Sequence, residues 1–261
     1  MDRRAAHEAR VDALVAAHLD RRRQGLKHPV EDFLFTYYNH RPNQLRAWYP
    51  GFDRAPTGKE RARIGWIRDL LAATRDRPPH LGCFGLHEWA MVYRDTETRH
   101  PVPLRMGHDE LAAFVESQNV RCGHFDAFRF FTPPARSLNL LQPTRDTQRD
   151  HEQPGCLHAN MDLYKWAYKL APLVPAELVV DCFELARDIR TLDMRASPYD
   201  LAALGYPPVR IETPNGRAEY VTHQRAFAGR AAPLRDRLVD ACDRLLATAP
   251  DPATVGGDRV P

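Results

Sequence analysis

The sequence predicts an α+β fold that is mainly α-helical, with helices around a small antiparallel sheet. Most segments repeat apolar residues at the i, i+3, i+4, i+7 spacing of a helix that buries one face. Two stretches, residues 121–132 and 208–221, lack that period and carry strand and hairpin signals instead. Helical and extended segments in separate parts of one chain are typical of α+β domains.

The expected helices follow one another along the chain. The first spans about residues 3–24, where Val11, Val15 and Leu19 share a face, and Gly25 ends it. Apolar periodicity, Pro breaks and possible caps define the others. They are expected from residue 29 onward, over 42–48, 61–73, 86–93, 108–117 and 160–170, and, as longer elements, over 176–193 and 224–247.

The predicted sheet rests on two local signals. Residues 121–132, RCGHFDAFRFFT, are rich in aromatic side chains and have no helical period, so they are expected to form a strand. Alternation along that strand places Cys122, His124 and Asp126 on one face. Further on, the dipeptide Asn215-Gly216 separates two short segments and predicts a β-hairpin.

Length and composition favour one soluble domain. A chain of 261 residues can bury a full core, so residues 1–249 are expected to form a single globular domain. Residues 250–261 are rich in Pro and Gly and are expected to be a disordered tail. Five irregularly spaced Cys, no apolar run of membrane length and no signal-peptide pattern predict a cytoplasmic protein without a membrane partner.

One stretch concentrates reactive side chains. Residues 152–170, EQPGCLHANMDLYKWAYKL, place Cys156 and His158 after a Pro-Gly turn and Asp162 in the helix that follows. Asn160 is a candidate helix cap. The loop and first helical turn are therefore the candidate site. The alternative is a capped core helix with a buried Cys, since free Cys and Trp are common core residues.

Metal binding is one chemistry that these residues support. Two Cys-x-His pairs, Cys122 with His124 and Cys156 with His158, together supply the Cys2His2 set that zinc accepts. A harder ligand set would suit a 2-His-1-carboxylate or dinuclear iron centre. Its candidate members are His87, Glu88, His124, Asp126, His158 and Asp162. Spacing does not choose among them, and buried structural Cys and His remain the alternative.

Acid/base chemistry without a metal is a second possibility. Glu88 lies in the apolar run LHEWAMV, where a carboxyl group titrates high unless it is paired. Aromatic residues near it, with Trp166, would line a pocket for a flat or cationic ligand. The competing interpretation of Trp89 and Tyr93, four residues apart on one helix face, is a core aromatic pair.

Five runs resemble a bacterial family customarily labelled 3-methyladenine DNA glycosylase, and the resemblance covers nearly the whole chain. The runs are HPVEDFLFTYYNHRP (28–42), FGLHEWAMVYR (84–94), RCGHFDAFRFFTP (121–133), EQPGCLHANMDLYKWAYKL (152–170) and DCFELARDIRTLDMRASPYDL (181–201). The motifs of the characterised glycosylases cannot be aligned with these residues. No catalytic residue is therefore transferred from such a relative.

The resemblance implies a DNA-repair hydrolase that excises alkylated bases. That reaction needs a flipped base in an aromatic pocket and a carboxylate to position water, for which Glu88 and Asp162 are the candidates. The candidate substrate-binding residues are Trp89, Tyr93, Tyr164, Trp166 and Asn160. DNA binding also needs a basic face, and a net charge of +3 supplies little phosphate affinity unless it is segregated.

Two other functions stay open at this point. The first is a metal-dependent enzyme, with iron or zinc as cofactor, that acts on a small molecule. Its candidate ligands are His87, Cys122, His124, Asp126, Cys156 and His158. The second is a non-catalytic binding protein.

Overall fold

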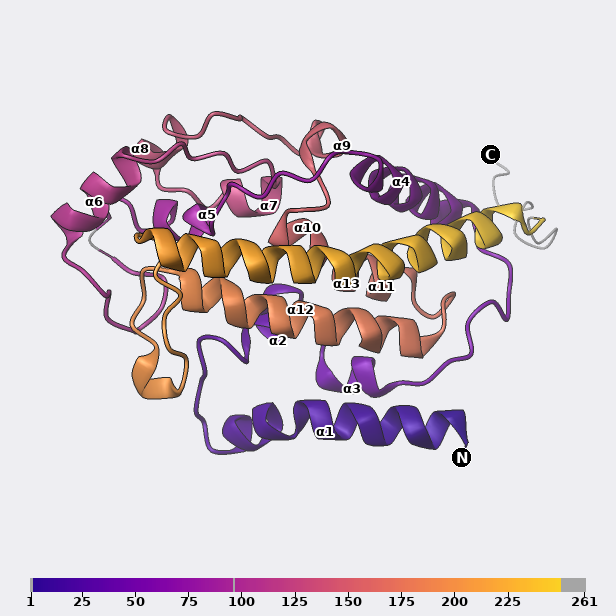
Figure 1. Cartoon of the computed structure of the whole chain (residues 1–261). Coiled ribbons are helices and arrows are strands. Elements are labelled where there is room, and N and C mark those ends of the chain that lie inside the picture. Colours follow the sequence, from indigo (N-terminus) through magenta and orange to yellow (C-terminus); the bar gives the residue numbers. More distant parts are fainter. Residues whose placement is uncertain (1, 96, 250–261) are drawn as a thin grey trace, which may run out of the picture.

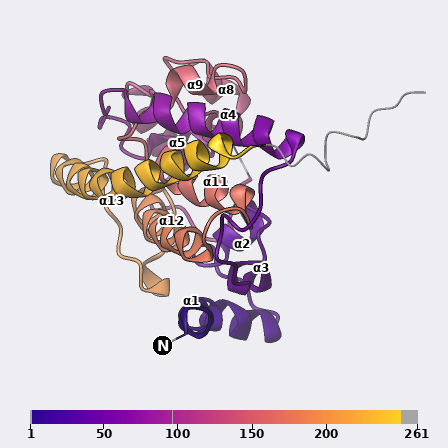
Figure 2. The ribbon, with the colours of Figure 1, turned by 90° about the vertical axis from the view of Figure 1, so that its right-hand side faces the viewer.

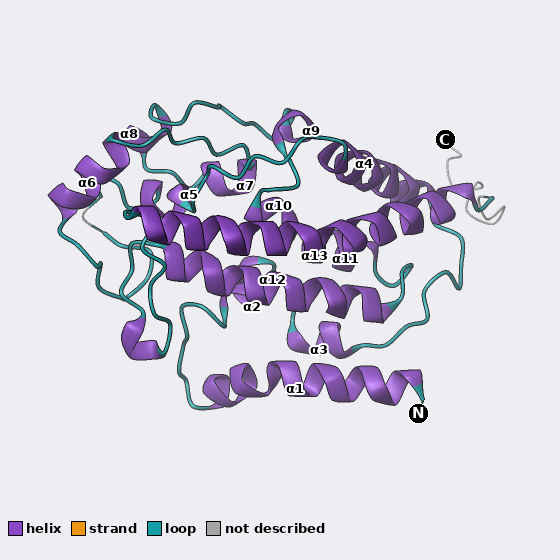
Figure 3. Cartoon of the chain, viewed as in Figure 1, coloured by secondary structure: helices purple, strands orange, loops and turns teal. Residues whose placement is uncertain are grey.

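The computed structural model describes residues 2–95 and 97–249, and this part of the chain contains helices and loops but no strand (Figure 3). Its one β-type contact is an isolated antiparallel bridge between Leu104 and Tyr199. The predicted α+β class with a small antiparallel sheet is therefore wrong. The fold is mainly α-helical.

Two long helices run side by side through the molecule (Figure 1). Helix α12, Ala176–Ala196, is the central one, with apolar side chains buried along most of its length. Helix α13, Pro214–Ala247, packs along it and also contacts α4, Gly58–Arg75. The stretch 152–170, which concentrates reactive side chains, contains α10, Leu157–Met161, and α11, Leu163–Leu170. Both helices pack on α12.

The remaining helices surround this centre. Helix α1, Arg3–Arg23, is capped by the Asp2 side chain and lies along one edge against α3, Pro42–Arg46 (Figure 2). The others are short. They are α2 (Phe33–Tyr37), α5 (Leu86–Ala90), α6 (His108–Glu116), α7 (Phe125–Phe128), α8 (Pro133–Arg136), α9 (Gln148–His151) and the 3-10 helix η1 (Ala202–Leu204).

The predicted strand at residues 121–132 is replaced by an extended loop and the helical turn α7. The Asn139 side chain occupies the place of a neighbouring strand, because its amide accepts from the Cys122 N–H at 2.7 Å and donates to the Cys122 carbonyl at 2.9 Å. This one side chain satisfies the buried backbone of Cys122, and the helical turn after it satisfies Ala127 and Phe128 through the His124 carbonyl, so the segment needs no sheet. Aromatic content reflects burial here and does not indicate pleating.

The predicted hairpin at Asn215-Gly216 is also wrong, because both residues belong to the first turn of α13. Thr213 caps this helix by accepting the Gly216 N–H at 3.1 Å, and Pro214 follows at the first helical position. A Cβ on residue 216 would lie 1.9 Å from the Arg210 carbonyl oxygen. The glycine therefore permits close packing of the preceding loop on the helix. The helix-start signal of Thr213 and Pro214 outweighs the hairpin signal of Asn215-Gly216.

One apolar cluster extends from Val11 in α1 to Leu245 in α13, so helices from both ends of the chain share a core. Among the described residues, none of the helices combines the length and apolarity that crossing a bilayer requires. The predicted tail at residues 250–261 lies outside the described residues. A set of buried charged and imidazole side chains interrupts the core between α5, α10 and α12.

Candidate functional site

Six buried His, Asp and Glu side chains gather in two groups at the centre of the molecule. The first triad is His87, His158 and Asp193, and the second triad is His124, Glu152 and Asp162. Within each triad, one potential ligand atom per residue lies within 4.8 Å of the other two. This is the spacing of side chains that surround one common point.

The first triad is assembled from three helices. His87 lies in the first turn of α5. This helix begins directly after Gly85, which has a left-handed φ of 71° that favours glycine. His158 lies on α10 and Asp193 near the end of α12. Because α10 packs on α12, these elements hold the imidazoles and the carboxylate together.

A short hydrogen-bond chain connects the first triad to an ion pair. The His87 Nε2 lies 2.7 Å from one oxygen of Asp193, and Arg190 donates to the other at 2.9 Å and to Glu88 at 2.8 Å. Burial lowers the pKa of His87, but the Asp193 and Glu88 carboxylates together outweigh burial and raise it. Burial raises the pKa of Glu88 against the opposing effect of Arg190.

His158 stands between the two triads. Its ring centroid is 4.3 Å from that of His87 and 5.2 Å from that of His124. Burial, together with the neighbouring His87, lowers its pKa well below the usual range. The lowered pKa leaves the imidazole neutral, and within the described part of the chain it makes no hydrogen bond, so it keeps a free lone pair.

Hydrogen-bond donors from outside the second triad hold its carboxylate Asp162. The His124 Nε2 lies 3.2 Å from Asp162 and 3.4 Å from Glu152. Asp162 also accepts from the Tyr38 hydroxyl at 2.7 Å and from Lys165 at 2.6 Å. Burial raises the pKa of Asp162, but the opposing effects of Lys165 and His124 place it well below its usual range. Asp162 is therefore ionised.

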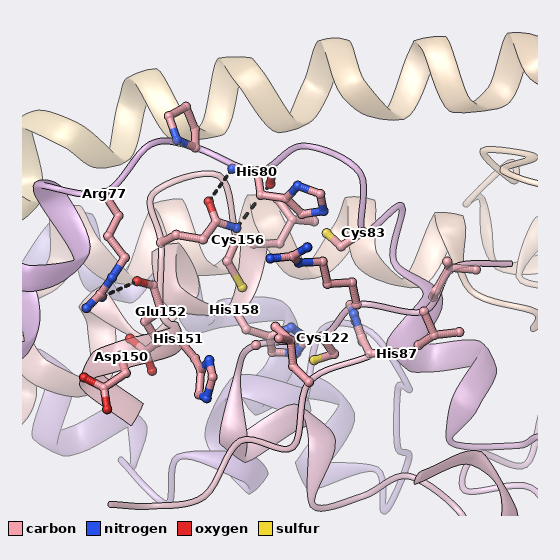
Figure 4. A pocket seen from close by; sticks show the side chains of 18 of the residues that line it. Arg77, His80, Cys83, His87, Cys122, Asp150, His151, Glu152, Cys156 and His158 are labelled. Carbon is pink, nitrogen blue, oxygen red and sulfur yellow. Dashed lines mark hydrogen bonds between the residues drawn. The ribbon is translucent and has the colours of Figure 1, made fainter. Parts of the chain in front are cut away.

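Two cavities meet at this cluster. The cysteine cavity, about 410 Å³, is lined by Cys83, Cys122 and Cys156 together with His87 and His158 (Figure 4). The aromatic cavity, about 270 Å³, lies on the other side and is lined by Phe33, Tyr37, Phe130, Glu88, Arg190 and His158. His158 lines both, so the cluster is accessible from two sides.

The predicted thiol ligands line a cavity without joining either triad. Burial raises the pKa of Cys122 to about 12 and that of Cys156 well above its usual value, so both are neutral thiols. The predicted ligand Asp126 instead forms ion pairs with Lys165 at 2.7 Å and Arg145 at 2.6 Å. Of the predicted ligands, the structure brings His87 and His158 into the first triad and His124 and Asp162 into the second.

The predicted substrate-binding residues do not line the two central cavities. Trp89 is buried against Phe114 and donates to the Ala196 carbonyl at 2.9 Å, and Tyr93 donates to Glu116 at 2.6 Å. The other three occupy neighbouring parts of the interior. Tyr164 bonds to His40, Trp166 packs on Trp66, and Asn160 accepts from Arg235.

Sequence analysis missed two members of the triads, Glu152 and Asp193. A signal for Asp193 exists, because it lies four residues after Ile189 and therefore on the buried face of α12. A carboxylate on such a face requires a partner. Glu152 precedes a Pro-Gly turn, and no spacing relates it to His124.

The composition of the cluster determines what it can bind. Two imidazoles and one carboxylate form the first triad, and one imidazole and two carboxylates the second. Nitrogen and carboxylate oxygen ligands of this kind suit iron, manganese and zinc, and the 2-His-1-carboxylate set is typical of non-haem Fe(II) sites. The competing role is structural, since protons shared between His and carboxylate can hold the helices together without any ion.

In comparisons with known proteins, no family model, no curated protein and no solved structure matches the chain. These comparisons neither support nor oppose the resemblance to the 3-methyladenine DNA glycosylase family. That resemblance, and the base excision it implies, stay predictions.

Proposed function

We propose that this protein is a metal-dependent enzyme acting on a small molecule, with one or two first-row divalent cations held by the two triads. The observation that carries the proposal is the convergence of six buried ligand side chains beside two cavities. Polar groups at such a depth are costly unless they are paired or bind a metal. A cavity next to them gives a substrate access.

The residues around the triads have defined supporting roles. His87, His158 and Asp193 would hold one cation, and His124, Glu152 and Asp162 a second. Arg190 and Lys165 donate to the carboxylates of Asp193 and Asp162 and would fix their orientation, as outer hydrogen-bond partners of metal ligands do. With iron bound, the site would supply redox or Lewis-acid chemistry.

His158→Gln tests metal binding directly, because His158 belongs to the first triad and loses no internal hydrogen bond on substitution. We expect the wild-type protein, loaded anaerobically with Fe(II) and desalted, to retain about one or two iron atoms per chain by elemental analysis. The variant should lose at least about tenfold in iron affinity, because removing even an outer hydrogen-bond partner of a metal ligand costs about 10–100-fold.

His151→Gln is the matched control, since His151 lines the cysteine cavity but belongs to neither triad. It should retain iron like the wild type, and circular dichroism should show both variants folded. If the wild-type protein retained no metal after reconstitution with Fe(II), Mn(II) and Zn(II) in turn, the proposal would be refuted. If His158→Gln retained as much metal as the wild type, the first triad would not be a metal site.

A further inference from the structure

We propose that the aromatic cavity binds a small apolar molecule with one anionic group, such as an aromatic or branched carboxylate, whose carboxylate is held by Arg99. This inference rests on the proposed function for the chemistry, because it identifies the substrate class of that site. The binding itself requires only the cavity, which the metal-free protein already contains.

The walls of the cavity select a flat or compact apolar body. Phe33, Tyr37, Met91 and Phe130 line it, and Tyr37 stacks on Phe33 with ring centroids 4.9 Å apart. The volume of about 270 Å³ is near the lower end of small-molecule sites. Aromatic walls of this size favour a single ring or a short branched chain.

The carboxylates that line the cavity are paired with basic side chains, whereas the arginine at its mouth is not paired with a carboxylate of the described residues. Glu88 is paired with Arg190, and Asp126 is paired with Lys165 and Arg145. Burial also lowers the pKa of His100 to about 4, so it lines the cavity as a neutral imidazole at neutral pH. Both carboxylates that line the cavity therefore already have basic partners.

Arg99 is the exception. Its guanidinium stacks over the Phe130 ring at 4.1 Å from the centroid and approaches the Met91 sulfur at 3.7 Å. Among the described residues, no carboxylate lies within ion-pair distance of it. A planar cation held against an aromatic wall can donate two parallel hydrogen bonds to a carboxylate.

The position of Arg99 also orients the ligand. Arg99 lines the aromatic cavity and also a neighbouring cavity beside α2. It therefore lies where the aromatic cavity opens. His158 and Glu88 line the same cavity next to the first triad. A carboxylate at Arg99 therefore directs the apolar part of the molecule toward the proposed metal ligands.

Calorimetric titration with phenylacetate and its neutral analogue phenylacetamide tests this assignment in metal-free and Fe(II)-loaded protein, without dioxygen. Phenylacetate should bind both forms, and phenylacetamide at least about tenfold more weakly, because charged hydrogen bonds contribute more than neutral ones. Arg99→Gln should weaken phenylacetate binding by about the same factor and leave iron content unchanged.

Arg94→Gln is the matched control, because Arg94 is an exposed arginine five residues earlier that lines neither central cavity and pairs with Glu116. It should bind phenylacetate like the wild type. Equal affinity for acid and amide, or full affinity in Arg99→Gln, would overturn the proposal. Binding to the metal-free protein without any iron retention would instead refute the enzyme function and leave the anion site standing.

Discussion

Arg190 is a single residue on which much of the buried charge depends. Its side chain is 2% exposed, and its guanidinium donates to both Glu88 and Asp193. The same guanidinium lies 3.8 Å from the Phe33 ring centroid. Removing one partner of a buried ion pair leaves the other charge buried without compensation. The loss of stability therefore exceeds the net contribution of the intact pair.

Arg190→Met should therefore lower the free energy of unfolding of the metal-free protein by about 3–5 kcal/mol. Urea denaturation followed by circular dichroism measures the change. Arg187→Met is the control on the same helix, because Arg187 is exposed and pairs with its neighbour Asp188; it should change stability by no more than about 0.5 kcal/mol. Equal effects of the two substitutions would mean that Arg190 is not structurally important.

His40 makes stability depend on pH. Burial lowers the pKa of His40 to about 4, whereas an unfolded histidine titrates near 6.5. Between these values the unfolded chain binds a proton that the folded protein does not. The resulting destabilisation of the folded state is therefore absent above about pH 7, grows as the pH falls through this window, and reaches about 3 kcal/mol at its lower end.

His40→Gln tests this effect, because glutamine does not titrate and its side chain can still hydrogen-bond to Tyr164. Between about pH 6.5 and 4, unfolding free energies from urea titrations should fall less steeply in the variant than in the wild type, with a difference of about 3 kcal/mol accumulated across the window. Parallel pH profiles would show that folding does not lower the pKa of His40.

Helix α13 shows how one position controls an element. The Arg210 carbonyl lies where a side chain on residue 216 would be, and the start of the helix packs against the preceding loop at that point. Gly229, in the same helix, has no atom within 4 Å of the position a Cβ would take. The two glycines therefore have opposite consequences on substitution.

Gly216→Ala should destabilise the protein by about 1–3 kcal/mol, because a backbone oxygen cannot move aside as a flexible side chain does. Gly229→Ala should stabilise it by about 0.5–1 kcal/mol, since alanine is the better residue in an exposed helix interior. Thermal unfolding of both variants measures the difference. A stabilised Gly216→Ala protein would show that the loop and the helix start do not pack closely.

For the molecule as a whole, metal binding and folding are linked through the triads. The ligands come from α5, α10 and α12 and from loops around them, so an unfolded chain cannot present them together. Any ion that binds the folded state alone stabilises it, by about 2.7 kcal/mol at a hundredfold excess over Kd. A proton shared between His87 and Asp193 must leave when the metal enters.

Fe(II) or Mn(II) should therefore raise the Tm of the wild-type protein in calorimetry under argon, and a chelator should reverse the rise. Binding should also release protons, measurable with a pH indicator in weak buffer. His158→Gln should show a smaller rise than His151→Gln, which lies outside the triads. A Tm that does not respond to any of these ions would contradict metal binding to the folded state.

Local patterns in the sequence determined the long helices and four of the six members of the cluster, His87, His124, His158 and Asp162. The apolar stripes of α4 and α12 place their buried faces correctly, and that of α1 does so at Val11 and Val15 but not at Leu19, which is exposed. Helical periodicity is a property of neighbouring residues. His87, His124 and His158 were also recognisable, since imidazoles in otherwise apolar surroundings are candidates wherever they fall. These features need no knowledge of what lies across the core.

Only the tertiary structure decided that residues 2–95 and 97–249 contain no sheet and how each triad is completed. The Asn139 side chain takes the hydrogen bonds of an expected strand, 17 residues away from Cys122. Asp193 meets His87 across 106 residues, and Asp162 meets His124 across 38. Contacts at such separations depend on how helices pack, and helix packing is not encoded in the spacing of residues within one segment.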